Sequence, residues 1–179
     1  RIGEEGEGFR YLLDGLSFST ASRLAGVEGE QNLSLQASQL HLDAGERRLR
    51  LEEGRLETTL RHPALGGSPL PLSMTFALEA DLQEESARLR DLELSGEHGL
   101  RLNGNLNVER LLDEPAYDGQ VRLAPFSLRP WLERFDSLPV MADAEALTDV
   151  ALTSPLRGDL SRLELSGLTL VVDDSTFTG

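Results

Sequence analysis

The side chains with the clearest chemical potential in this chain are adjacent carboxylates. Asp173 and Asp174 stand directly before Ser175, and two neighbouring carboxylates could serve as metal ligands or as an acid–base pair. Neighbouring residues of a strand point to opposite faces, however, and Asp and Ser favour turns because their side chains bond to nearby backbone groups. The pattern therefore favours a hairpin corner at these residues over a catalytic pair.

The remaining reactive residue types do not converge in the sequence. His41, His62 and His98 are scattered without the short spacing of a metal-binding pair, and the chain has no cysteine. No nucleophile elbow, phosphate-binding glycine loop or dinucleotide fingerprint occurs. We therefore expect a non-catalytic protein with no catalytic residues, no metal site and no cofactor.

Charge and composition restrict the partners further. The formal net charge is −14, which disfavours a nucleic acid or an anionic membrane surface as the partner. Hydrophobic residues make up 39% of the chain and aromatic residues only 5%, so leucine must supply most of the buried surface. No segment approaches the roughly 20 apolar residues of a membrane-spanning helix, and we expect any membrane anchor to lie outside this segment.

Alternation of apolar and polar residues with period two is the main structural signal. It predicts half-buried strands along nearly the whole chain. Clear examples lie at 16–19, 33–37, 40–43, 49–52, 74–80, 92–95, 100–108, 163–166 and 168–171. Short turn signals between strands, such as Asp14-Gly15, Ala44-Gly45 and Glu53-Gly54, favour an antiparallel meander.

The alternation slips by one residue at two places. Leu89 is out of phase with Leu92 and Leu94, and the pair Leu163 and Leu165 is out of phase with Leu168 and Leu170. Because a slip of one residue turns every later side chain over, we predict a β-bulge or tight corner at 90–91 and at 166–167.

A helical pattern interrupts the strands near Phe126. Leu128, Trp131 and Leu132 fall on one helical face, with Ser127 as the candidate N-cap and Pro130 in the first turn. A second, single-turn helix is predicted at 143–147. The expected organisation is one continuous domain with a β-strand segment over 1–125, a helical connector over 126–147 and the start of a further β repeat over 148–179. Repetition is indicated because Leu92–Gly96 recurs as Leu163–Gly167.

The segment from about Ala116 to Gly179 resembles the AsmA family of Gram-negative envelope proteins. Its order is a short helix at 126–135, then Leu138-Pro139, an Asp143–Leu147 turn, and a strand pair ending in Asp173-Asp174-Ser175-x-Phe177-x-Gly179. Pro130 and Trp131 stand where the family often has small or aliphatic residues. Residues before Ala116 match only in their alternating style.

The resemblance implies a periplasmic protein tethered to the inner membrane, similar to bridge-like lipid-transfer proteins and linked to outer-membrane biogenesis. We expect a mostly β fold, an open curved antiparallel sheet, that lines a hydrophobic groove for phospholipid acyl chains. The expected groove residues are Leu92, Leu94, Leu100, Leu102, Leu106, Val108, Leu163, Leu165, Leu168 and Leu170. The alternative is a scaffold that binds envelope assembly proteins through its sheet edges without any lipid.

Overall fold

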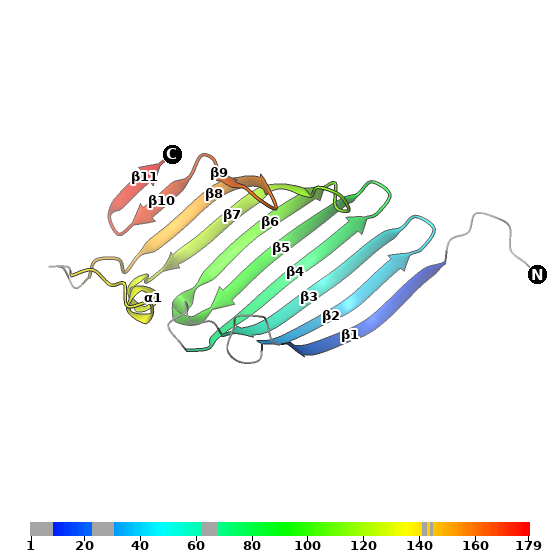
Figure 1. Ribbon diagram of the computed structural model, residues 1–179, viewed down its shortest axis with the longest axis horizontal. Coiled ribbons are helices and arrows are strands. Elements are labelled where there is room, and N and C mark those ends of the chain that lie inside the picture. The colour runs from blue at the N-terminus through cyan, green and yellow to red at the C-terminus, as the bar shows by residue number, and fades with distance from the viewer. Residues whose placement is uncertain (1–8, 23–30, 62–67, 141–142, 144) are drawn as a thin grey trace, which may run out of the picture.

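The computed structural model is a single open antiparallel sheet, as the alternation predicts (Figure 1). The structure describes residues 9–22, 31–61, 68–140, 143 and 145–179. The sheet contains eleven strands: β1 (Arg10–Ser22), β2 (Gln31–Asp43), β3 (Arg48–Leu60), β4 (Leu70–Asp81), β5 (Ser86–Gly96), β6 (Arg101–Glu109), β7 (Ala116–Phe126), β8 (Val150–Asp159), β9 (Leu163–Leu165), β10 (Thr169–Val172) and β11 (Ser175–Thr178). A 3-10 turn, η2 (Glu97–Gly99), joins β5 to β6, and one short helix, α1 (Arg129–Arg134), lies between β7 and β8.

Each strand pairs with the strand next to it in the chain, from β1 through to β8. The short strands β9 and β10 then pair with successive parts of β8. Strand β11 pairs with β10 and is the last strand of the sheet. Strand β8 is hydrogen-bonded to β7, so the sheet continues without a break across the connector that contains α1.

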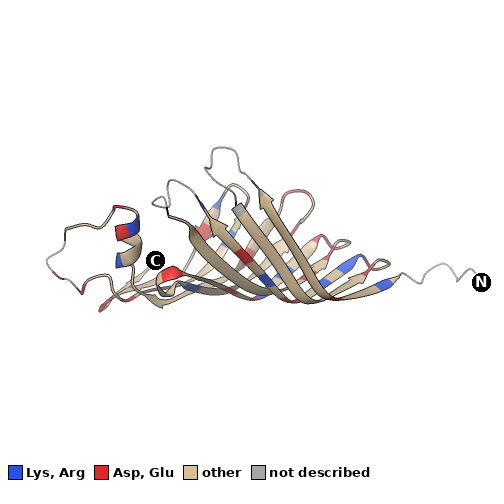
Figure 2. Cartoon of the chain, turned by 90° about the horizontal axis from the view of Figure 1, so that it is seen from below, with Lys and Arg blue, Asp and Glu red and all other residues tan. Residues whose placement is uncertain are grey.

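Backbone irregularities at mid-strand bend the sheet. Gly15 in β1, Glu53 in β3 and Asp91 in β5 have φ angles of 68°, 49° and 51°, and register shifts occur beside Glu53 and Asp91. Bulges of this kind increase twist and curvature, and Figure 2 shows the strand ends curling upward. Asp14-Gly15 and Glu53-Gly54 therefore lie inside 13-residue strands. The prediction of turns at these two sites is wrong. A residue with a left-handed backbone conformation fits an irregularity inside a strand as well as a turn, so glycine does not distinguish the two.

Both predicted phase slips are confirmed. Leu89 pairs with Leu106 and Leu92 pairs with Gly104, so the bulge at Asp91 returns both leucines to one face. In the second case Leu165 pairs with Leu156 and Leu170 pairs with Leu152. The left-handed Gly167, with φ 66°, lies between β9 and β10 and restores the face there.

The first half of the sheet is built from a repeated two-strand unit. Strands β1, β3 and β5 begin at Arg10, Arg48 and Ser86, each 38 positions apart, and their left-handed residues keep the same spacing. Arg10 pairs with Asp43 and Arg48 pairs with Asp81, in both cases with Nε and Oδ2 2.8 Å apart. The repeat is thus one of strand start and left-handed position, with the ion pair kept at β1 and β3. Its period is shorter than the 71-residue offset between Leu92–Gly96 and Leu163–Gly167.

The helical connector is smaller than predicted. Helix α1 spans Arg129–Arg134 and has Leu128 at its N-cap with no side-chain hydrogen bond, so the assignment of Ser127 as N-cap is wrong. Pro130 does lie in the first turn. The predicted second helix is also wrong, because residues 145–147 form a turn whose last residue, Leu147, has φ 64°.

Candidate functional site: the concave apolar wall

Apolar side chains line up across the strands in two long rows on one face of the sheet. The strand register joins one residue from each strand into the first row: Phe18, Leu35, Leu56, Met74, Leu94, Leu102, Leu123, Leu152, Leu170 and Phe177. The second row consists of Leu13, Leu40, Leu51, Leu78, Leu89, Leu106, Gly119, Leu156 and Leu165. We call these two rows the apolar wall.

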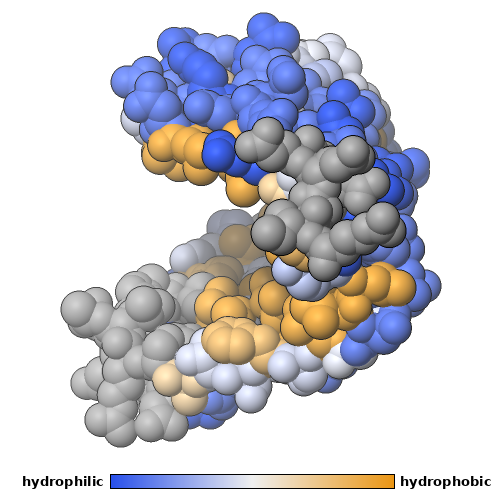
Figure 3. All heavy atoms as spheres, turned by 90° about the vertical axis from the view of Figure 1, so that its right-hand side faces the viewer, coloured by the Kyte–Doolittle hydropathy of each residue, from blue (hydrophilic) through white to orange (hydrophobic). Residues whose placement is uncertain are grey.

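The apolar wall lies on the concave side of the curved sheet. Seen along the long axis, the molecule has a C-shaped outline whose inner surface is hydrophobic and whose outer surface is hydrophilic (Figure 3). Ten strands at about 4.8 Å spacing give the first row a length of roughly 43 Å along the sheet. One leaflet of a bilayer has a hydrocarbon depth of about 15 Å, so the wall is long enough for more than one acyl chain.

All ten predicted groove residues lie on this face. Leu94, Leu102, Leu106, Leu165 and Leu170 belong to the apolar wall itself. Leu92, Val108 and Leu163 lie beside it through their pairing with Gly104, Tyr117 and Gly158, while Leu100 and Leu168 directly precede β6 and β10 in phase with wall residues.

The predicted set omits the N-terminal half of the wall. Phe18, Leu35, Leu56 and Met74 continue the first row through β1 to β4. The same period-two alternation identifies these residues in the sequence once their strands are joined in register.

The apolar wall is not covered by a second layer in the part of the chain that the structure describes. Within that part only six hydrophobic side chains are buried: Ala37, Leu51, Leu70, Ala87, Trp131 and Val150. A closed sandwich would bury the inward residues of every strand. Most wall leucines are instead half-buried by their neighbours, and the two ends of the sheet are open, with Phe18 and Phe177 each more than half exposed.

Helix α1 packs at one border of the wall. Its Trp131 is buried, and the indole ring lies edge-on to His98 of η2, with ring centroids 6.0 Å apart. Arg134 holds the helix in place through Glu97, at 2.7 Å, and through the backbone oxygen of Pro69, at 3.0 Å. The indole Nε1 of Trp131 has no hydrogen-bond partner within the described part of the chain, so the side chain contributes here through contacts of its ring.

The convex face carries paired charges. Near the turns that follow β2 and β4, Arg48 contacts both Asp81 and Glu46, and Glu79 contacts both Arg50 and Arg90. The guanidinium of Arg48, with the N–H of Glu84, holds the pKa of Asp81 below its usual value. The two faces therefore differ in charge, because the convex face carries ion pairs and none of the wall residues is charged.

Asp173 stabilises the connector. It occupies the β10–β11 corner with φ 50°, as the hairpin interpretation predicts. Its carboxylate accepts hydrogen bonds from the backbone N–H groups of Leu147, Thr148 and Asp149 at 2.7–3.1 Å. These donors, led by Leu147, lower the pKa of Asp173. The Asp-Asp-Ser segment thus joins the turn after α1 to the end of the sheet.

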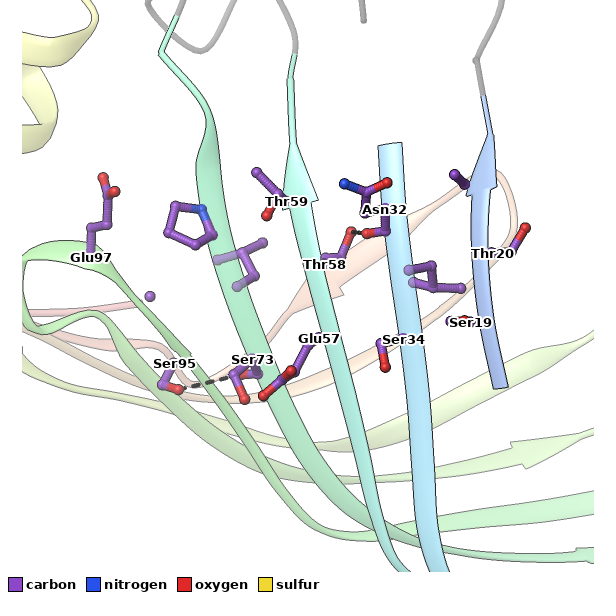
Figure 4. Close-up of a pocket in the computed structure, with 15 residues that line it drawn as sticks. Ser19, Thr20, Asn32, Ser34, Glu57, Thr58, Thr59, Ser73, Ser95 and Glu97 are labelled. Carbon is purple, nitrogen blue, oxygen red and sulfur yellow. Dashed lines mark hydrogen bonds between the residues drawn. The ribbon is translucent and has the colours of Figure 1, made fainter. Parts of the chain in front are cut away.

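A large surface depression lies near one end of β1 to β5 (Figure 4). It measures about 780 Å³. Polar residues that pair in register contribute much of its lining, namely Ser19, Ser34, Glu57, Ser73 and Ser95. Both of its carboxylates are engaged, Glu57 by Arg55 at 2.9 Å and Glu97 by Arg134. The depression therefore offers hydroxyl groups without a free acid–base pair.

Metal-binding clusters and membrane-spanning helices are not found in the described ranges. These residues contain no group of three or more His, Asp or Glu side chains placed to hold a metal ion. No helix among them is both long and apolar enough to span a bilayer. Comparison with protein-family models, curated proteins and solved structures gives no match for this chain.

Proposed function

We propose that the apolar wall shields phospholipid acyl chains, and that the protein is a non-catalytic, AsmA-like groove segment of the Gram-negative periplasm that carries lipid between inner and outer membranes. The observation that supports this most is the continuity of the first row, which crosses ten strands without a charged residue on a face that no second layer of described residues covers. In a soluble protein, a contiguous exposed apolar surface usually marks a binding site.

The energy available to a guest is substantial. Burial of one methylene stabilises a complex by about 0.8 kcal/mol. An acyl chain with roughly 15 methylenes that turns half of its surface to the wall would gain about 6 kcal/mol. The convex face, with its ion pairs, offers no comparable gain to an apolar guest.

Replacing Leu102 or Leu106 with Asp tests the proposal, because both leucines lie in central strand β6 on the apolar wall. The matched control is Asn105→Asp, which adds the same charge to the opposite face of the same strand. Purified from bacterial envelopes without detergent, the wild-type chain and the control should carry phospholipid in native mass spectrometry. The Leu102→Asp and Leu106→Asp variants should carry much less.

The same experiment separates lipid carriage from a scaffold role. If the leucine variants remain folded by circular dichroism and retain wild-type amounts of lipid, the wall is not the lipid site. If the wild-type chain carries no lipid under any condition, the protein functions without a lipid guest, and the scaffold interpretation replaces this one.

A further inference from the structure

Strands β4, β6 and β8 end along the same long side of the sheet (Figure 1). The turn that follows each of them carries an exposed leucine. Leu82 lies in the β4–β5 turn, Leu112 in the β6–β7 turn and Leu160 in the β8–β9 turn. Their exposed fractions are 41%, 67% and 85%. We call these three residues the leucine rim. Turns normally present polar residues to solvent, so three successive turns with an outward leucine need an explanation.

Backbone hydrogen bonds join the first two turns of the leucine rim to their neighbours, and the third turn is held by bonds within itself. The N–H of Leu82 donates to the oxygen of Arg47 in the neighbouring turn, and the N–H of Leu111 donates to the oxygen of Glu85, at 3.0 and 2.9 Å. Within the last turn the carboxylate of Asp159 accepts the N–H groups of Ser161 and Arg162. The leucines are therefore displayed on an ordered edge, which lowers the entropic cost of contact with a partner.

Acidic residues flank the leucines on the same edge. Glu84 and Glu85 follow Leu82, and Asp113 and Glu114 follow Leu112. Arg110 and Arg162 also lie on these turns, and Arg162 is paired with Glu164, so carboxylates remain in excess on the edge. An edge of this composition attracts a partner with apolar side chains flanked by Lys or Arg. The same carboxylates oppose close approach to an anionic bilayer surface.

The spacing of the leucines suggests the shape of that partner. Successive turns on this edge are two strands apart, or about 10 Å. Seven residues of an α-helix rise about 10.5 Å. We infer that the leucine rim binds an amphipathic, basic helix of another protein, with an apolar residue near every seventh position set against each leucine. The rim would bind this helix with or without a guest in the groove.

A synthetic helical peptide of leucine and lysine, with leucine at every seventh position, is the probe. Its binding to the delipidated chain is measured by fluorescence anisotropy, beside a peptide in which glutamate replaces lysine. We expect the lysine peptide to bind, and the triple variant Leu82→Ser, Leu112→Ser, Leu160→Ser to weaken binding at least tenfold. The double variant Glu84→Lys, Glu114→Lys should also weaken it. Leu12→Ser serves as the control, since Leu12 is 54% exposed on the polar face of β1.

Three results would overturn the inference. In the first, the triple variant, folded by circular dichroism, binds the lysine peptide as tightly as the wild type does. In the second, the glutamate peptide binds as well as the lysine peptide. In the third, the chain does not bind the peptide but binds phosphatidylcholine vesicles through the same three leucines, which would make the edge a membrane contact.

Discussion

Replacing Gly119 with alanine should lower the free energy of unfolding by about 2–3 kcal/mol, because the backbones of β6 and β7 are very close at this residue. A Cβ atom on Gly119 would lie 2.1 Å from the backbone oxygen of Asn105 and 3.1 Å from the Cα of Leu106. Ordinary contact begins at 3.4 Å, so the two strands must separate.

The magnitude combines three effects. Overpacking costs about 1–3 kcal/mol, and each ladder hydrogen bond lost costs about 1 kcal/mol. The smaller conformational freedom of alanine in the unfolded chain offsets about 0.4–1 kcal/mol of this loss. For a chain of this size the net change corresponds to a fall in Tm of roughly 6–9 °C.

Urea unfolding followed by far-UV circular dichroism measures the change, with Gly15→Ala as the control. Gly15 has φ 68°, but a Cβ atom added there would meet no described atom within 4 Å. Its substitution therefore carries only the left-handed backbone cost of about 1–2 kcal/mol. If Gly15→Ala destabilises the chain as much as Gly119→Ala does, the close approach of β6 and β7 is not what requires glycine at 119.

Local geometry leads to three more expected outcomes. The carboxylate of Asp173 has a lowered pKa, so its stabilising effect is complete above its unfolded pKa and lost as the pH falls below about 4; Asp173→Asn should flatten this acid limb of the Tm profile. Glu53→Gly should raise the free energy of unfolding by about 0.5 kcal/mol in urea titrations, because Glu53 has φ 49°. Arg134→Ala should lower it by about 2 kcal/mol and red-shift the emission of Trp131, since α1 loses its contacts with Glu97 and Pro69.

Matched variants and contrary results accompany these three substitutions. An unchanged acid limb in Asp173→Asn would show that the connector does not depend on this carboxylate. Glu57→Gly, at a regular position of the same strand, should lower stability by about 1 kcal/mol, so equal effects at 53 and 57 would contradict the role of the bulge. Arg162→Ala removes an exposed ion pair with Glu164 and should change stability little. If Arg162→Ala and Arg134→Ala lower the free energy of unfolding by similar amounts, Arg134 does not anchor α1 as proposed.

The sheet and its apolar face were predictable from the sequence because both depend on local alternation. Period two gives the strands, and the slips at Arg90-Asp91 and Ser166-Gly167 indicate where a bulge must return the leucines to one face. The ten expected groove residues share a face for this reason. Their contact with lipid stays a prediction.

Other features were hidden because they depend on contacts between distant residues or on geometry that several residue types allow. The sequence at 145–147 favours a helix, but the N–H of Leu147 donates to the carboxylate of Asp173, which is 26 positions away. The 38-residue unit is obscured because glycine, glutamate and aspartate occupy the same left-handed position in β1, β3 and β5. The leucine rim is visible in the sequence only as single leucines among polar turn residues.

The curved sheet forms a trough. The 38-residue unit allows the length of this trough to change by whole units. Residues 48–85 comprise β3, the connection to β4, β4 itself and the turn after it. The acids Asp43 and Asp81 precede turns of the same length before β3 and β5. Excision of this segment would bring β2 against β5 in the register that β2 now has with β3, with Asp91 in the place of Glu53. Gain or loss of such units would change the length of the trough in steps of two strands, while the pairing between the remaining strands stays the same.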